Sequence, residues 1–385
     1  MKDPFNIAKA AALFLLLILS WVAPSPLLAQ QTSAPTYHAE TTEVLVPTLV
    51  TDQEGKVIYG LTAKDFIIRD NGVEQTAQMD ETFSSKPVSL VEAVQTGGSA
   101  PSAIGSGCAL QRDVNEFTRP IGKCRSALHG IGLMLETFLN APGSEMALVS
   151  FDSHVKLRQG FSPDVSHVTR ALDTLPGGDT GSVLLDAVQF SLNLLKNRGS
   201  DRRRVLVVIS QQSDGGSKTV TLEEAARQII ASDIEVYMVA YPPDFKQAAE
   251  GLAKLFGPAR SSPTRPDYAG VPGSTQGSAA ASLDILGLIS FLRSSAHDEN
   301  VPQTIADITG GEYVLFHNEK GLDDALGLLA NHAHNRYQLS FKVKKPAPGP
   351  HKLEVFLRES ANVRISARAG YIPDATQMPL PTDSK

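Results

Sequence analysis

The spacing of hydrophobic residues divides the chain into three parts. In residues 42–84 short runs alternate apolar and polar positions, and Asn71-Gly72 between two such runs is a strong hairpin signal. Residues 86–333 instead combine unbroken apolar runs with segments whose apolar positions recur every three or four residues. Short alternating runs return in residues 336–372. The pattern predicts two β-rich segments on either side of a domain that alternates strands and helices.

The unbroken apolar runs of the middle part are typical of strands that are covered on both faces. Examples are Met146–Phe151, Arg204–Ser210 and Ile234–Ala240. Helical segments separate them, and Thr221 with Glu224 has the spacing of a capping box at the start of one. Because strands that alternate with helices build parallel sheets, we expect an α/β fold with a doubly wound, mostly parallel sheet. The two flanking segments are similar in character, so we expect them to join in one accessory β-rich unit.

Two stretches inside the α/β domain are rich in glycine, serine and alanine. Residues 94–119 separate the first short strand from the first long helix, and residues 257–282 follow a later strand. Such a composition supplies no core pattern. We expect both stretches to be surface insertions, and the second to be flexible.

The N-terminus has the order of a secretory signal. Lys2 and Lys9 flank the start of an apolar run, Ala10–Ala23, which is followed by Pro24-Ser25-Pro26 and then by Ala29 before a polar stretch. The run has about 14 residues, fewer than the roughly 20 that a membrane-spanning helix needs. We therefore expect cleavage after Ala29, and an uncleaved N-terminal anchor is the alternative.

These expectations divide the ends of the chain into a signal peptide (1–29), a polar leader (30–41) and a polar tail (373–385). After residue 30 we expect no membrane-spanning segment, because no later run is long and apolar enough. The predicted localisation is therefore exported, either periplasmic or extracellular.

Cys108 and Cys124 are the two cysteines of the chain. Both lie in the part predicted to be exported, where an oxidising compartment allows thiols to pair. A bridge would stabilise the protein by roughly 3 kcal/mol through the unfolded state, and two free thiols are the alternative. The bridge would staple the 94–119 insertion to the first helix. We expect the stapled insertion to cover the carboxyl end of the sheet, where open α/β sheets bind ligands.

Composition and charge limit the classes of partner. The 385 residues are enough for two compact domains, and 42% hydrophobic with 20% charged residues is the composition of a soluble globular protein. A net charge of -6 argues against binding to a nucleic-acid backbone, which needs a clustered basic surface. Arg202–Arg204 is a dense basic cluster, but its place just before an apolar strand predicts a solvated loop. We therefore expect a protein partner and no nucleic acid.

The order of elements in the α/β domain resembles a known family. A long helix pattern begins at Ile121 and is followed by the strand Met146–Phe151, by Gly177-Gly178, by Asp186-Ala187 and by the strand Val205–Ser210. This order is similar to that of a von Willebrand factor A-type domain. The resemblance implies an α/β domain that binds other proteins.

The flanking segments are similar to one subfamily, the von Willebrand factor A-related proteins typical of Acidobacteria. Val50–Phe66 looks like the leader of that subfamily, and Arg336–Leu339, Pro350–Val355 and Ala367–Tyr371 look like its tail. The resemblance covers roughly residues 42–372, and its specificity lies in the joint occurrence of all these parts.

The resemblance also implies a divalent-cation site at the carboxyl end of the sheet. Such sites use an Asp-x-Ser-x-Ser loop after the first strand, a threonine from a later loop and an aspartate after the central strand, and these oxygen ligands suit Mg²⁺ or Mn²⁺. With Val88–Val91 as the first strand, Glu92 stands for the aspartate, Val94 for the first serine and Thr96 for the second. Valine has no side-chain oxygen, so this loop departs from the family's pattern.

The other ligand positions depart from the pattern as well. Ser182, or Thr180 near it, stands in the threonine position, and Gln211 replaces the expected aspartate. Asp214 follows three residues later and reaches the site only if its loop bends back. An amide in place of a carboxylate removes much of the attraction that offsets the dehydration of Mg²⁺, so we expect a degenerate site and no cofactor. The rival is a rearranged Mg²⁺ or Mn²⁺ site built from Glu92, Thr96, Ser182 and Asp214.

Catalytic motifs are missing from the sequence. It has no Gly-x-Ser-x-Gly elbow, no His-Glu-x-x-His pair and no phosphate-binding loop. Asp152-Ser153-His154 follows a strand, but adjacent residues cannot fold onto one another to form a relay. His332 and His334, two apart on a helix, point to different faces. We expect an exported, non-catalytic protein-binding or scaffolding module; metal-dependent adhesion is the first alternative and a hydrolase the second.

Overall fold

The computed structural model describes residues 41–80, 86–104, 141–199, 201–242, 287, 300–344, 346–347, 349–359 and 362–373. No helix among these residues is long and apolar enough to cross a membrane. The predicted signal peptide, the 257–282 insertion and both cysteines lie outside the described residues, as does the 94–119 insertion beyond Ile104.

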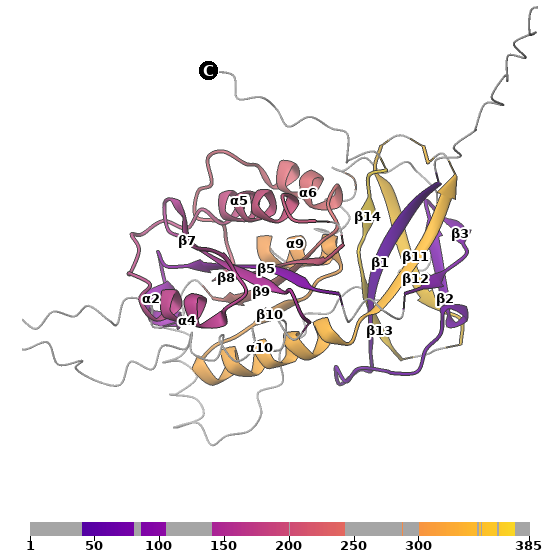
Figure 1. Ribbon diagram of the computed structural model, residues 1–385, viewed down its shortest axis with the longest axis horizontal. Coiled ribbons are helices and arrows are strands. Elements are labelled where there is room, and N and C mark those ends of the chain that lie inside the picture. Colours follow the sequence, from indigo (N-terminus) through magenta and orange to yellow (C-terminus); the bar gives the residue numbers. More distant parts are fainter. Residues whose placement is uncertain are drawn as a thin grey trace, which may run out of the picture. The chain divides into compact units, whose positions relative to one another are not determined.

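A six-stranded sheet forms the centre of the α/β domain (Figure 1). Its strands lie in the order β10-β9-β8-β5-β6-β7, and every neighbouring pair is parallel except β6 and β7. The predicted α/β fold with a mostly parallel sheet is thus confirmed. The strands are β5 (Val88–Gln95), β6 (Glu145–Phe151), β7 (Val155–Ser162), β8 (Arg203–Gln211), β9 (Ile234–Tyr241) and β10 (Tyr313–Leu315).

Helices cover both faces of this sheet (Figure 1). Helices α5, α6 and α9 share one core with Val91 and Ala93 of β5, whereas α2, α4 and α10 share the other core with Leu90 and Val94. Successive residues of one strand therefore enter two different cores, which explains why its apolar run is unbroken. The helices are α2 (Ala100–Ile104), α4 (Val165–Asp173), α5 (Leu184–Lys196), α6 (Leu222–Ile230), α9 (Val301–Thr309) and α10 (Glu319–His334).

The two flanking segments join in one β-rich unit, as predicted. Its sheets have the orders β13-β1-β11-β4 and β14-β12-β2-β3. Strand β1 pairs antiparallel with β11, and β2 pairs antiparallel with β12, so each pairing joins the start of the chain to its end. Val46, Phe66 and Phe341 lie in the core that the two sheets share. The elements are β1 (Thr41–Thr51), a 3-10 turn (Ala63–Asp65), β2 (Phe66–Asp70), β3 (Val73–Gln75), β4 (Gln78–Met79), β11 (Tyr337–Lys344), β12 (His351–Leu357), β13 (Arg364–Ala367) and β14 (Gly370–Tyr371).

Strand β5 is longer than its sequence suggested. The apolar run predicted a strand that ends at Val91, but the strand continues to Gln95 and every one of its residues is buried. Glu92 stays in the ladder, opposite Leu148 of β6 and Val207 of β8. Because charged residues are almost never fully buried without a partner, a glutamate normally indicates that a buried strand has ended. In this protein the strand continues for three residues beyond Glu92.

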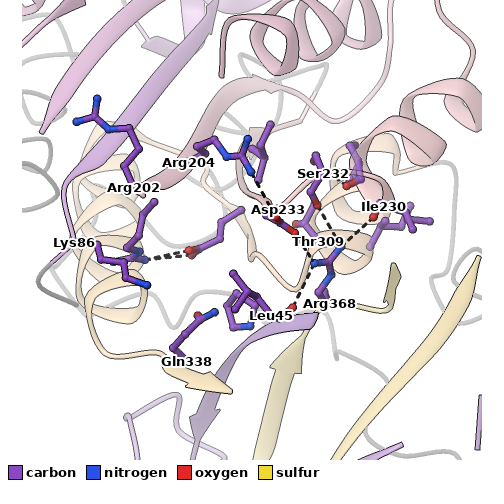
Figure 2. Close-up of a pocket in the computed structure, with 16 residues that line it drawn as sticks. Leu45, Lys86, Arg202, Arg204, Ile230, Ser232, Asp233, Thr309, Gln338 and Arg368 are labelled. Atoms are coloured by element: carbon purple, nitrogen blue, oxygen red, sulfur yellow. Dashed lines mark hydrogen bonds and ion pairs between the residues drawn. The ribbon is translucent and has the colours of Figure 1, made fainter. Parts of the chain in front are cut away.

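The arginine cluster is not the solvated loop that its sequence predicted. Arg203 begins β8 and is buried, and its guanidinium donates to the carboxylate of Glu235 (3.3 Å) and to the carbonyl of Ala333 (2.9 Å). Arg202 and Arg204 line a cavity at the amino ends of β8 and β9 (Figure 2). The partners are distant in sequence, so no local pattern reveals this burial.

Candidate functional site

Three loops meet at the carboxyl edge of the six-stranded sheet. We name them the β5 loop (residues 96–99), the β6 loop (152–154) and the α5 loop (176–182), which leads into α5. The backbone N–H of Gly178 in the α5 loop donates to the carbonyl of Thr96 in the β5 loop, at 2.8 Å. The β5 and α5 loops are therefore joined through their backbones, and the carboxylate of Asp179 ties the α5 loop to the β6 loop by accepting from the backbone N–H of Ser153 (3.0 Å).

Glycines allow the loops to approach this closely. A Cβ atom at Gly97 would lie 2.2 Å from the carbonyl oxygen of Gly181, and one at Gly178 would lie 2.7 Å from the Cβ atom of Asp152. Real Cβ atoms do not approach other atoms to these distances. Gly97 and Gly178 thus have a packing role at this edge.

Two glutamines lie where the family resemblance requires carboxylates. Gln95 is the last residue of β5, and Gln211 is the last residue of β8. Oε1 of Gln95 accepts from the backbone N–H of Gln211 (2.9 Å), and Nε2 donates to Oε1 of Gln211 (3.3 Å) and to the carbonyl of Gly97 (3.0 Å). The hydroxyl of Ser99 also donates to Oε1 of Gln211 (3.3 Å). The two amides are therefore bonded to each other and to their own loop.

This arrangement does not fit a divalent cation at the family's position. Because β5 ends at Gln95, the ligand loop begins there, three residues later than expected from Glu92. The position of the first serine is then Gly97, where the carbonyl of Gly181 leaves no room for any side chain. Mg²⁺ and Mn²⁺ depend on carboxylate ligands, and the two positions that supply them in this family carry neutral amides.

Glu92 lies inside the sheet, away from this edge. Three residues of strand separate it from Gln95, about 10 Å at the usual rise of a strand. Its side chain is fully buried, and neither carboxylate oxygen has a hydrogen-bond partner among the residues that the structure describes. Burial raises its pKa from the ordinary 4.5 to about 8. Val94, the other mid-strand residue of the expected loop, contributes to the apolar core.

The other predicted ligands do reach the carboxyl edge, but two of the three have other partners. The hydroxyl of Thr96 donates to a backbone carbonyl of β6 (3.3 Å). The carboxylate of Asp214 accepts from the backbone N–H (2.9 Å) and the hydroxyl (2.7 Å) of Ser217. Ser182 is buried, and its carbonyl accepts from the N–H of Gly215 (2.6 Å), whereas no described residue hydrogen-bonds to its hydroxyl. The structure thus brings Ser182 and the Asp214 loop together and leaves Glu92 apart.

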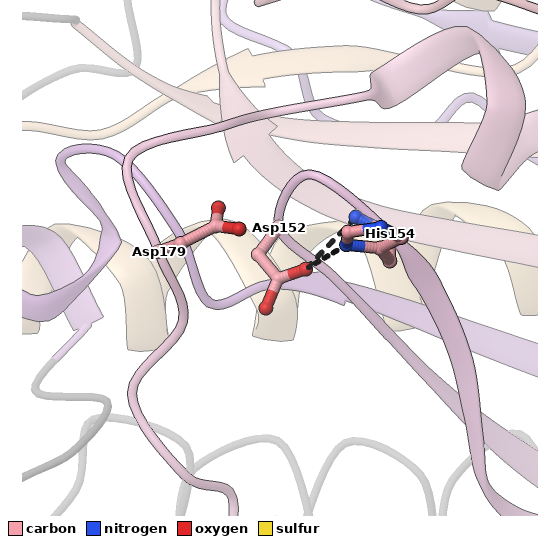
Figure 3. Close-up of side chains that lie close together, drawn as sticks. All are labelled: Asp152, His154 and Asp179. Atoms are coloured by element: carbon pink, nitrogen blue, oxygen red, sulfur yellow. Dashed lines mark hydrogen bonds and ion pairs between the residues drawn. The ribbon is translucent and has the colours of Figure 1, made fainter.

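A different group of metal-ligating residues gathers at the same edge (Figure 3). Asp152, His154 and Asp179 each offer one ligand atom, and these atoms lie within 4.8 Å of one another. Asp152 is buried, whereas His154 and Asp179 are exposed. Hydrogen bonds from the backbone of Gly181 and from Ser153 lower the pKa of Asp179. The carboxylate of Asp179 is therefore held in its charged form next to the β6 loop.

Comparison with known families finds one match. Residues 113–216 match the family model described as the von Willebrand factor type A domain. No curated protein matches the chain.

Several solved structures are similar to the chain. One is the conserved hypothetical protein BatB from Bacteroides thetaiotaomicron, with 13% identity, 63% of this chain and 99% of that chain covered, and a TM-score of 0.35. Another is a von Willebrand factor type A protein from Catenulispora acidiphila, with 8% identity, coverages of 87% and 74%, and a TM-score of 0.40. A third is the vWF domain of the type V pili tip protein Mfa5 from Porphyromonas gingivalis, with 13% identity, coverages of 64% and 95%, and a TM-score of 0.32.

Proposed function

Residues 113–216 match the von Willebrand factor type A domain, and we propose that the α/β part of this chain is such a domain and binds a protein partner at its carboxyl edge without a metal ion at the family's position. The observation that carries the proposal is the hydrogen-bonded pair of Gln95 and Gln211. The pair fills the place of two cation-binding carboxylates with a neutral contact that needs no ligand. The hydrogen bonds that hold this edge together therefore do not depend on a metal ion.

The surface of this edge supports a role in protein binding. Its loops are joined through their backbones, so little conformational freedom is lost when a partner binds. The exposed side chains are polar, among them Ser153, His154, Asp179 and Thr180. A metal-bearing domain offers a cation to a partner's carboxylate, whereas this edge offers the charged carboxylate of Asp179. We therefore expect the partner to present a cationic or hydrogen-bond-donating group.

A pull-down from the native envelope tests the proposal. The mature protein is used as bait in EDTA and in Mg²⁺, together with the variants Asp179→Arg and Asp173→Arg. Asp173 is also exposed but lies at the end of α4, so it is a matched control. We expect the same partner with and without EDTA, loss of that partner with Asp179→Arg and retention with Asp173→Arg. Loss in EDTA, or equal binding by both variants, contradicts the proposal.

Metal-dependent adhesion is the second candidate, and the Asp152, His154 and Asp179 group favours it. A ligand set of one imidazole and two carboxylates suits Mn²⁺ or Zn²⁺ better than Mg²⁺. Under this alternative, Mn²⁺ or Zn²⁺ raises the melting temperature of the wild type but not that of His154→Gln. Under the first proposal, neither ion has this effect.

The proposal also includes export of the protein and a non-catalytic role. Export is supported by the basic, apolar and small-residue order of residues 1–29. It is tested by sequencing the N-terminus of the protein from its native source, which we expect to begin at Gln30. We assign the Ser162–His167 contact (3.2 Å) a structural role at the start of α4, where the hydroxyl of Ser162 also accepts from the N–H of Asp164 (3.1 Å).

A further inference from the structure

A cavity lies at the amino ends of β8 and β9, at the edge of the sheet opposite to the three loops (Figure 2). Its volume is about 60 Å³. A single water needs roughly 10–15 Å³ on the same measure, so the space accommodates a group of about four or five heavy atoms. Leu45 and Gln338 of the β-rich unit lie on one side and Arg204 of β8 lies on the other.

Cationic side chains outnumber anionic ones around this cavity. Asp80 pairs with Lys86 from outside the cavity (2.9 Å), and Glu145 pairs with both Arg202 and Arg198. Among the described residues, the lining groups and their named partners amount to six cationic groups and four carboxylates. The side chains that line the cavity itself are the anionic Asp233 and Glu235 and the cationic Lys86, Arg202, Arg203, Arg204 and Arg368.

Arg204 has the least complete set of partners among these cations. A guanidinium has five N–H donors, but within the described residues its side chain makes one long hydrogen bond, 3.5 Å to Asp233. Asp233 also accepts from Arg368 (3.2 Å). Burial, and after it the charge of Arg204, lowers the pKa of Lys196. Among the described residues, Arg204 therefore shares its one carboxylate partner with Arg368.

Gln338 brings an unpaired amide to the opposite wall. The residue is 2% exposed, and neither its side-chain oxygen nor its side-chain nitrogen has a hydrogen-bond partner in the described ranges. Nearly all buried polar groups in proteins are paired, and an unpaired one destabilises the fold. Gln338 is among the residues that line the cavity, so its amide is the nearest unpaired polar group on this wall for a polar ligand to engage.

We propose that the cavity binds a small oxyanion, of phosphate or carboxylate chemistry, through Arg204 and Gln338. Both side chains offer N–H donors, and the excess positive charge favours an anion over a cation. Hydrogen bonds from a charged donor to an oxyanion are short and strong, so Arg204 contributes most of the affinity. The site is separate from the carboxyl edge and does not depend on the function proposed for that edge.

Thermal unfolding of the full chain in three salts tests this proposal. Inorganic phosphate, acetate and chloride are compared at equal ionic strength. Phosphate or acetate should raise the melting temperature over chloride by about 3 °C or more at saturation. A rise with phosphate alone identifies a phosphate-type ligand, and a rise with acetate as well identifies the broader carboxylate class. The same melting temperature in all three salts overturns the proposal.

Two variants and one control locate the effect. Arg204→Gln should weaken phosphate binding about tenfold or more, measured by isothermal titration calorimetry. Gln338→Leu should weaken phosphate binding by less than Arg204→Gln does and leave stability in chloride unchanged or higher, which a purely structural glutamine would not do. Arg227→Gln removes an exposed arginine of α6 that pairs with Glu223, and it should bind phosphate like the wild type. Equal phosphate binding by the wild type and Arg204→Gln overturns the assignment, even if Gln338→Leu does not fold.

Discussion

Replacing Glu92 by glutamine should stabilise this protein at and above neutral pH. Glu92 lies in the middle of β5 between two parallel neighbours and is fully buried, and within the described part of the chain neither of its oxygens has a hydrogen-bond partner. Burial raises its pKa to about 8, from an ordinary value of 4.5. The carboxyl group is therefore protonated and neutral in the folded protein at pH 7.

The size of the effect follows from the pH at which the carboxyl group of Glu92 loses its proton in the unfolded and in the folded chain. The unfolded chain releases it near pH 4.5, whereas the folded chain keeps it to about pH 8. Between these values the folded state binds more protons than the unfolded state. The free energy of unfolding consequently falls as the pH rises, by about 1.4 kcal/mol per pH unit. The loss reaches about 5 kcal/mol near pH 8 and grows no further above it.

The glutamine variant has no proton to lose, so it escapes this decline. A buried amide and a buried protonated carboxyl carry similar costs when unpaired, and the two proteins should be about equally stable near pH 4.5. At pH 7 the variant should be more stable by about 3 kcal/mol. Urea unfolding followed by circular dichroism at pH 5, 7 and 8.5 measures the difference.

Glu54→Gln serves as the control, because Glu54 is exposed in a turn and its pH profile should match the wild type. A difference between the wild type and Glu92→Gln that does not change with pH would refute the reasoning. So would a glutamine variant that is less stable at pH 8.5, since this would indicate that the carboxylate has a partner.

Two further predictions concern packing and the insertion. Gly178→Ala should destabilise the protein by about 2 kcal/mol or more, because its Cβ would lie 2.7 Å from that of Asp152. Gly327→Ala in α10, where a Cβ meets nothing within 4 Å, should instead stabilise the protein by about 0.5–1 kcal/mol. Urea unfolding measures both effects, and the same change in stability for both variants would contradict the packing argument. Replacing Cys108 and Cys124 by serine should increase protease cleavage within residues 95–120 if the cysteines pair. Unchanged cleavage there argues against a stapled insertion.

The elements with strong local signals could be predicted from the sequence. The capping box of α6 forms as its spacing predicts: the N–H of Thr221 donates to Glu224 (2.8 Å), and the N–H of Glu224 donates to the hydroxyl of Thr221 (3.2 Å). Gly310 ends α9 in the left-handed conformation, with φ of 70°. Unbroken apolar runs identified β6, β8 and β9 because helices cover both faces of the sheet.

The features that were missed depend on contacts between distant residues. The charge of Glu92 suggested that β5 ends at Val91, whereas the strand continues to Gln95. The predicted ligand loop therefore begins three residues too early, and the prediction does not include Gln95. Asp179 is brought to Asp152 by the fold alone. A second carboxylate directly after Gly177-Gly178 was the available signal, since that loop was already expected at the carboxyl edge. The burial of Arg203 likewise requires Ala333, which lies 130 residues away.

Whether the carboxyl edge binds a divalent cation is the most direct test of this account. Thermal unfolding of the full chain should be measured in EDTA and in millimolar Mg²⁺ or Mn²⁺. The amide pair of Gln95 and Gln211 predicts the same melting temperature in all three. A saturable rise with Mg²⁺ or Mn²⁺ would contradict the account, and its loss in Asp179→Asn would assign the ion to the group of Asp152, His154 and Asp179.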